Sequence, residues 1–415
     1  MKYILYGGNL INLVFAEELC KKKMEFSWYT LGEKIGGHFS GINVNNNLVD
    51  LGMVFLEFGT DDIEPLDGAR DISTSQALLN FFYEFKTEPA IIRCKVGSRV
   101  YPDYIISDDC SLLWEGNYKT NLLPEHPSSK WKNNYFESIS YDEYCKLSYV
   151  NFYSEMVEPF AKKISFGGYK KLSARYHRSA WLPLYYQETI SGKDRKIKPY
   201  PFRKFLGKSV ADVISDKITF LKSKNNIFID ESTQNLENLI LENRTSSNFI
   251  SCDLGKFGIE YIDLLSENTF QTKINIAIFS HKENKSLGFD CINDIDDKEI
   301  YRVTFQTTSS GSRSFIVVEG VGSFPNDNDW ASKAKLYLYN NFSLNDLDLE
   351  FNRSYLNGVR LPLPGAEEIL NSIRKSINMR YKNHNCFNYG IQNGFQALSM
   401  NCQVSHAINN WVSYI

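Results

Sequence analysis

The stretch that decides the fold lies at the start of the chain: Tyr3-Ile4-Leu5-Tyr6-Gly7-Gly8-Asn9-Leu10-Ile11-Asn12. A short apolar run meets a glycine pair, and apolar residues then recur at helical spacing as far as Cys20. A second apolar run, Phe26-Ser27-Trp28-Tyr29-Thr30, follows a lysine-rich turn. Strand, glycine turn, helix and strand within about 30 residues predict a βαβ unit whose two strands are parallel and adjacent.

Later segments alternate between helical and strand patterns. Residues 73–85, 141–164 and 209–221 have helical spacing, whereas residues 90–113, 274–279, 301–306 and 314–319 have the alternation typical of strands. We therefore expect an α/β fold in which a Rossmann-type dinucleotide-binding domain is joined to a β-rich (α+β) substrate domain. The dinucleotide-binding domain is predicted to comprise residues 1–85, 201–262 and 376–415, and the substrate domain residues 86–200 and 263–375.

Composition excludes several classes of function. The 415 residues carry 46 basic and 49 acidic side chains, a formal net charge of -3, which provides no field for nucleic acid or an anionic membrane. No apolar run approaches the ~20 residues of a transmembrane helix. The eight cysteines form no CxxC pair and no metal-ligand spacing with histidine. These features predict a cytoplasmic protein with reduced thiols, no metal and a small-molecule substrate; the oligomeric state is not predicted.

In this order the motifs resemble the FAD-binding amine oxidase and protoporphyrinogen oxidase superfamily, including UDP-galactopyranose mutase-like relatives encoded with surface-polysaccharide genes. That superfamily has a GxGxxG turn, a strand ending in an acidic residue, a Gly-Gly loop and an Asp-x-Gly strand. The resemblance implies a cofactor, FAD, and these candidate FAD-binding residues: Gly7, Gly8, Asn9, Asn12, Thr30, Gly36, Gly37, His38, Gly390, Met400 and Asn401. The last three belong to a segment that resembles the one closing over the flavin.

Three positions depart from the superfamily pattern. Asn9 and Asn12 replace the glycines that let backbone approach the pyrophosphate and let the helix pack on the strand. Thr30 replaces the acidic residue that accepts hydrogen bonds from ribose, a loss of about 1.5–3 kcal/mol. The two asparagine side chains are expected to intrude on the phosphate space, so the pattern predicts FAD that is held weakly and non-covalently.

Substrate contacts are predicted at two places. In Tyr301-Arg302-Val303-Thr304, strand alternation places Arg302 and Thr304 on one face, and a buried arginine there would need an anion. Arg178, Tyr185 and Tyr186 combine a cation with aromatic rings that can stack on a sugar. The alternatives stay open: Arg302 on a solvent-exposed face, and Arg178 in a solvated turn before a buried aromatic strand.

The sequence thus predicts a flavin-dependent oxidoreductase or mutase that acts on a small polar substrate, such as a nucleotide sugar or an amine. Hydrolase and NTPase motifs are absent, and no catalytic residue is assigned. The alternative is a non-redox or cofactor-less descendant that uses the same scaffold to bind another ligand or a partner protein.

Overall fold

The structure is a computed structural model of the chain. It describes residues 2–52, 55–57, 74–96, 99–102, 139–148, 168–173, 202–224, 227–243, 247–253, 263–264, 266–281, 287–294, 296–307, 314–380 and 386–389, with single helical residues or pairs at 158, 162, 404 and 407–408.

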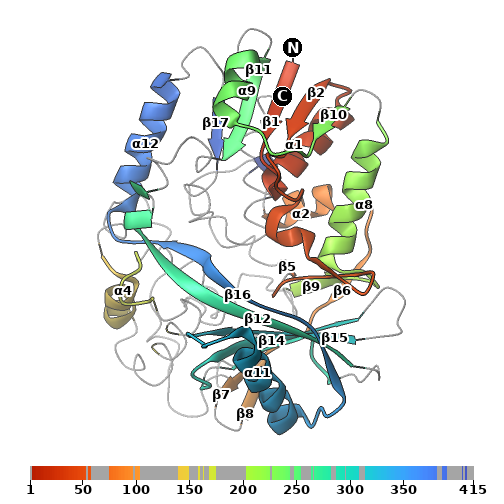
Figure 1. Ribbon diagram of the computed structural model, residues 1–415, viewed down its shortest axis with the longest axis vertical. Coiled ribbons are helices and arrows are strands. Elements are labelled where there is room, and N and C mark those ends of the chain that lie inside the picture. Colours follow the sequence, from red (N-terminus) through yellow and green to blue (C-terminus); the bar gives the residue numbers. More distant parts are fainter. Residues whose placement is uncertain are drawn as a thin grey trace, which may run out of the picture.

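A five-stranded sheet forms the upper part of the molecule in Figure 1. Every neighbouring pair in it is parallel. Its order is β10 (Ile227–Asp230), β2 (Phe26–Tyr29), β1 (Lys2–Tyr6), β11 (Ser247–Asp253) and β17 (Cys386–Tyr389). The predicted parallel pairing of the first two strands is confirmed, and three distant segments of the chain supply the sheet.

Two helices pack with the first strands of this sheet. Helix α1 (Leu10–Lys21) and helix α8 (Val210–Lys222) share one apolar cluster with Trp28 of β2. Lys217 of α8 forms a 2.7 Å ion pair with Glu17 of α1, and both side chains are less than a tenth exposed. Phe81, at the end of α2 (Thr74–Phe81), lies 4.4 Å from the Lys217 ammonium, so the buried charge has both an anion and a ring face.

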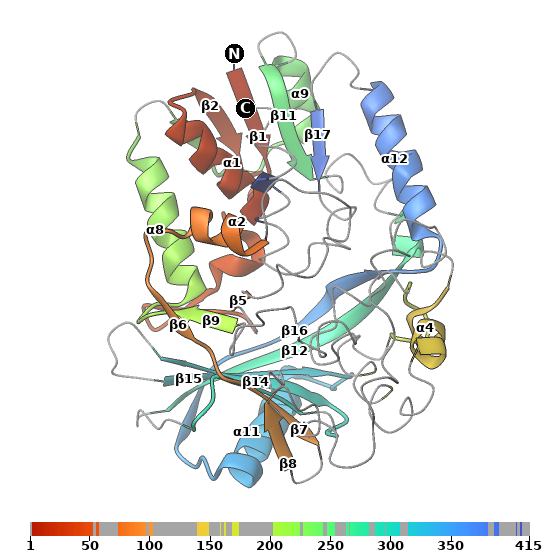
Figure 2. The same ribbon diagram turned by 180° about the vertical axis from the view of Figure 1, so that it is seen from behind.

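A seven-stranded sheet forms the lower part of the molecule (Figure 2). Its strands are antiparallel except for the β13–β7 pair. Its order is β16 (Leu347–Pro362), β12 (Thr269–His281), β15 (Ser314–Val321), β14 (Ile300–Thr307), β13 (Cys291–Asp294), β7 (Ile92–Val96) and β8 (Arg99–Pro102). The long β12–β16 pair extends from this sheet towards α12 (Ala366–Arg380) in both views.

Each face of the seven-stranded sheet is covered by a different element. Ile316 and Val318 of β15 pack with α11 (Asp327–Phe342). Phe315 and Val317, the alternate residues, pack with the hairpin of β3 (Ile42–Val44) and β4 (Asn47–Val49). The hairpin follows the Gly36-Gly37 loop in sequence, so this second face is the one turned to the N-terminal part of the chain.

The remaining described elements are short. A three-stranded antiparallel sheet joins β5 (Leu56–Glu57), β9 (Phe202–Phe205) and β6 (Thr87–Pro89). The other helices are η1 (Gly37–Ser40), α4 (Tyr141–Ser148) and α9 (Leu236–Asn243). The sequence patterns did not predict α11, α12 or β16, and only the first part of the helix expected over residues 141–164 lies within α4. Among the described residues no helix has the length and apolar content to cross a membrane.

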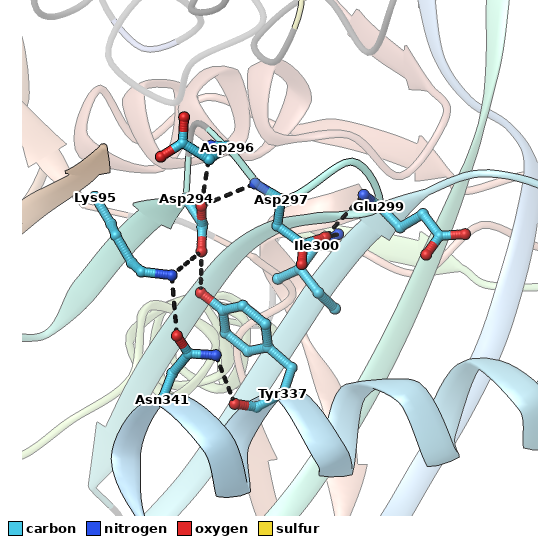
Figure 3. Close-up of polar contacts among 8 residues, drawn as sticks. All are labelled: Lys95, Asp294, Asp296, Asp297, Glu299, Ile300, Tyr337 and Asn341. Atoms are coloured by element: carbon cyan, nitrogen blue, oxygen red, sulfur yellow. Dashed lines mark hydrogen bonds and ion pairs between the residues drawn. The ribbon is translucent and has the colours of Figure 1, made fainter. Parts of the chain in front are cut away.

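A polar network fixes α11 to the edge of the seven-stranded sheet (Figure 3). The fully buried Asp294 carboxylate accepts from the Lys95 ammonium at 2.8 Å and from the Tyr337 hydroxyl at 2.6 Å. Its other oxygen accepts two backbone N–H groups, from Asp296 and Asp297. Burial by itself would raise the pKa of Asp294, but Lys95 and Tyr337 hold that pKa below its usual value.

Candidate functional site

The glycine turn between β1 and α1 lies at the carboxyl edge of the parallel sheet. Gly7 has φ +94°, a conformation that residues with a side chain rarely adopt. Its N–H donates to the Tyr29 carbonyl at 2.8 Å, and its carbonyl accepts the Trp28 indole N–H at 2.9 Å. Since β2 lies on one side of β1 and β11 on the other, the turn is at the switch point where α/β folds bind ligands.

The two asparagines of the turn have separate structural roles. The Asn12 amide is fully buried and donates to the carbonyls of Tyr6 and Gly7, at 2.8 and 2.9 Å, so it braces the turn from beneath. The expectation that its side chain fills phosphate space is therefore wrong. The Asn9 side chain caps α1 by accepting the Asn12 N–H at 3.0 Å. This cap occupies one of the backbone donors that an anion at the helix N-terminus would use.

Thr30 follows β2 directly and is fully buried. Its backbone N–H donates to the Asp230 carbonyl at 2.8 Å, and its hydroxyl has no hydrogen-bond partner among the described residues. The structure therefore leaves Thr30 no accessible surface with which to meet a ribose.

The Gly-Gly loop packs directly against the glycine turn. A Cβ on Gly8 would stand 2.7 Å from the Lys34 carbonyl oxygen, and the Gly8 N–H donates to the Glu33 carboxylate at 2.8 Å. Gly36 has φ +91°, and a Cβ there would stand 2.7 Å from Ile214 of α8. Both glycines are thus required by close approach, and Glu33 is a residue of this site that the motif comparison did not identify.

Arg302 lies at the junction between the seven-stranded sheet and these N-terminal loops. Its guanidinium forms a two-point ion pair with Glu319 of the neighbouring strand, at 2.6 and 2.9 Å, and the two side chains are 13% and 8% exposed. The solvent-exposed alternative is therefore wrong. A Cβ on Gly52 would stand 2.6 Å from the Glu319 carboxylate, so the Asp-x-Gly segment contacts the pair. Oppositely charged residues on paired strands were the sequence signal for this contact.

His38 follows Gly37 and lies near the same ion pair. The ring keeps accessible surface, yet the surrounding protein desolvates it enough to lower its pKa. Glu319 opposes that decrease, and Arg302 adds to it. The structure therefore places His38, the histidine predicted from the sequence, between the Gly-Gly loop and Arg302.

Asp50 joins the two parts of the molecule. Its carboxylate accepts the N–H groups of Val210 and Ala211 at 2.9 and 2.8 Å, at the start of α8. Its backbone exchanges two 2.9 Å hydrogen bonds with the Gln306 side chain of β14. Desolvation is the main cause that raises the pKa of Asp50 to about 7; the two N–H groups oppose the increase and Asp212 adds to it.

Six of the predicted contacts lie outside the described residues: Gly390, Met400 and Asn401 for the cofactor, and Arg178, Tyr185 and Tyr186 for the substrate. Their roles stay predictions. Within the part of the chain that is described, no group of three or more His, Cys, Asp or Glu side chains could hold a metal ion.

Comparison with known proteins finds similarity in structure only. No protein-family model and no curated protein matches the chain. An oxidoreductase from Methanosarcina mazei superposes with TM-score 0.57 at 12% identity, covering 98% of this chain and 99% of that one. A protein from Exiguobacterium sp. 255-15 described as a protoporphyrinogen oxidase gives 0.58 at 11%, covering 100% and 98%. Putrescine oxidase bound to putrescine gives 0.59 at 10%, covering 100% and 99%.

These matches extend over nearly the whole of each chain. The protein therefore shares its α/β fold with these oxidase and oxidoreductase structures. Identities this low show a common fold, and substrate and cofactor are questions for the residues of this chain.

Proposed function

We propose that this protein binds FAD non-covalently at the carboxyl edge of the five-stranded sheet and is an oxidoreductase or mutase for a small polar substrate. The observation that carries the proposal is the Gly7 turn, which connects β1 to α1 at the switch point of a wholly parallel sheet. A dinucleotide's phosphates are bound at this position in Rossmann-type domains, by backbone N–H groups and the positive end of the helix dipole.

The residues of the turn fit such a ligand in part. Asn12 is turned into the protein, and the glycines at positions 7, 36 and 37 keep the backbone free of side chains. Gly7, Gly8, Gly36, Gly37 and His38 would line the cofactor, which when bound supplies the electron-transfer chemistry. The Asn9 cap and the buried Thr30 lower the expected affinity, so the binding we propose is weak.

Fewer observations support the choice of substrate. Arg302 lies at the junction with the N-terminal loops, but its guanidinium already donates two hydrogen bonds to the Glu319 carboxylate. An anionic substrate would have to share the guanidinium, so a neutral or cationic polar group suits the Arg302–Glu319 pair equally well. A nucleotide sugar, which the resemblance to mutase-like proteins suggests, and an amine are both candidate substrates. The two-domain division, contacts from Arg178, Tyr185 and Tyr186, and a cytoplasmic location also belong to the proposal.

The test is titration of the purified protein with FAD, followed by flavin fluorescence and by thermal shift. We expect quenching that saturates, and a gain in melting temperature. Asn9→Gly removes the cap that uses the Asn12 N–H and should strengthen FAD binding by about tenfold, a gain of ~1.4 kcal/mol. Asn235→Gly is the matched control, because Asn235 caps α9 through the same contact, to Asn238 N–H at 3.1 Å. A protein that shows neither quenching nor thermal shift at millimolar FAD contradicts the proposal.

A second candidate is a cofactor-less descendant that binds another ligand or a partner protein on this scaffold. Thr30 favours it, because the residue at the ribose position is fully buried and offers no charge. Under this candidate neither the wild-type protein nor Asn9→Gly binds FAD, although both fold.

A further inference from the structure

We propose that Glu33 performs the role that the superfamily pattern assigns to position 30: its carboxylate accepts the ribose hydroxyls of the bound dinucleotide. The inference rests on the proposed function, because it requires a dinucleotide at the glycine turn. It assigns a new binding residue to this chain and gives the site a preference for a ligand with free ribose hydroxyls.

The position of Glu33 is the first support. Its carboxylate lies 2.8 Å from the Gly8 nitrogen, so it stands at the turn itself. Glu33 is partly exposed, whereas Thr30, only three residues earlier, has no exposed surface. Of these two residues after β2, only Glu33 combines an acidic group with solvent access beside the turn.

The conformation of the connecting segment explains the displacement. Leu31 and Gly32 have φ +58° and +75°, and the Glu33 N–H donates to the Thr30 carbonyl at 3.0 Å, closing a tight turn. Leucine rarely adopts a positive φ, so the surrounding structure must hold it there. A Cβ on Gly32 would stand 2.5 Å from the Thr233 hydroxyl, which shows how closely this turn is packed.

The same turn brings the backbone of residues 33 and 34 against the glycine turn. A Cβ on Gly8 would meet the Glu33 Cβ at 2.9 Å and the Lys34 carbonyl oxygen at 2.7 Å. The carboxylate therefore reaches Gly8 from a backbone that is already in contact, and needs no movement of the loop. Thr30 instead lies beside the end of β10, where its backbone N–H donates to the Asp230 carbonyl.

The chemistry of a carboxylate suits a diol. Two oxygens offer about four acceptor positions, so a carboxylate that accepts the Gly8 N–H can also accept hydroxyl groups. Such charge-assisted bonds are roughly twice as strong as neutral ones. A negative charge at Glu33 would in turn disfavour a 2′-phosphate, so the site should select unphosphorylated ribose.

The experiment measures binding of the adenosine half of the ligand by calorimetry. The probes are ADP, 2′,3′-dideoxy-ADP and adenosine 2′,5′-bisphosphate, and the proteins are the wild type, Glu33→Gln and Glu25→Gln. Glu25 is an exposed glutamate before β2, at the opposite end of that strand from the turn, and serves as the matched control. We expect the wild type and Glu25→Gln to bind ADP at least tenfold more tightly than either other probe. Glu33→Gln should lose most of this preference.

Each result decides the matter. ADP binding with the full preference retained in Glu33→Gln overturns the role of Glu33 and leaves the proposed function standing. A wild type that binds neither ADP nor FAD overturns both. If Glu33→Gln does not fold, the wild type can still overturn the role of Glu33, because equal affinity for ADP and the dideoxy compound would show that no acceptor reads the hydroxyls.

Discussion

The two sheets use buried polar side chains in different ways. Around the glycine turn of the parallel sheet the fully buried groups are neutral: Asn12 and Trp28 donate to backbone carbonyls, and Thr30 carries a hydroxyl that has no partner among the described residues, whereas the acidic group at the turn, Glu33, is partly exposed. The antiparallel sheet instead buries charges in pairs, Arg302 with Glu319 and Lys95 with Asp294. Neutral side chains that bond to the backbone fix the shape of the turn without adding a charge to it.

Paired charges have the opposite consequence. In both of these pairs the two charges lie within 3 Å of each other, so each charge is compensated without a ligand. Removing one partner of such a pair leaves an uncompensated charge, which is costly in a buried site. The difference predicts large stability losses in the antiparallel sheet and small changes at the glycine turn.

The largest loss is expected for Asp294→Ala. The substitution leaves the Lys95 ammonium, the Tyr337 hydroxyl and two backbone N–H groups without their acceptor. We expect the free energy of unfolding to fall by about 3–5 kcal/mol in urea denaturation. Asp346→Ala, at an exposed aspartate after α11, should change it by less than about 0.5 kcal/mol. Equal values for the two variants would mean that the network does not hold α11.

Asp50, which links the two regions, should make stability depend on pH. Its folded pKa of about 7 exceeds the reference value of 3.8, so the folded state binds the extra proton between those values. The contribution is therefore fully present below about pH 4 and is lost as pH rises through 7. Between pH 5 and 8 the loss amounts to roughly 2–3 kcal/mol.

Asp50→Asn removes this titration. The unfolding free energy of the wild type minus that of the variant should decrease by the same amount from pH 5 to pH 8, measured in urea at both values. Asp212, which faces the same end of α8, is left intact in both proteins. A difference that is constant with pH would show that Asp50 is ionised throughout that range.

Arg302→Lys tests whether the pair at the junction is structural. Lysine keeps the charge but loses the planar fork that makes two bonds to Glu319. We expect a loss of about 2 kcal/mol in unfolding free energy, the value of one hydrogen bond to a charged group. Arg353→Lys, at an exposed position of β16, is the control and should be nearly neutral. An unchanged melting temperature with weakened ligand binding would instead identify Arg302 as a substrate residue.

The sequence predicted those parts of the fold whose signal is local. The run from Tyr3 to Asn12 specified strand, turn and helix. The β3–β4 hairpin has a comparable local signal in Asn45 and Asn46, which both adopt positive φ. Helix α11 was not predicted because Leu336 and Tyr339 on its exposed side blur the apolar spacing of its buried residues, and it is held by packing against β12 and β16. Tertiary contacts, not propensity, stabilise such helices.

The site was predictable at its glycines and less so at its side chains. Gly7, Gly36 and Gly37 have the positive φ that the motif requires. Motif alignment assumed that the residue at position 30 faces the ligand. Thr30 is buried instead, and the turn at Leu31 and Gly32 places the Glu33 carboxylate beside Gly8. A one-dimensional pattern cannot register that change, because it depends on backbone conformation.

The smallest effect, and the one of opposite sign, is expected for Thr30→Val. The buried hydroxyl has no hydrogen-bond partner in the described part of the chain, so burial costs it the hydrogen bonds of water without a compensating bond. Valine has nearly the same shape, and we expect it to raise the free energy of unfolding by about 1 kcal/mol. Thr87→Val should act in the other direction, because the Thr87 hydroxyl accepts the Arg203 guanidinium at 2.8 Å. Dinucleotide affinity should not change in Thr30→Val, since a residue with no accessible surface cannot contact the ligand directly. A fall in FAD or ADP affinity in this variant, measured by the same calorimetry, would return the ribose contact to Thr30 and remove it from Glu33.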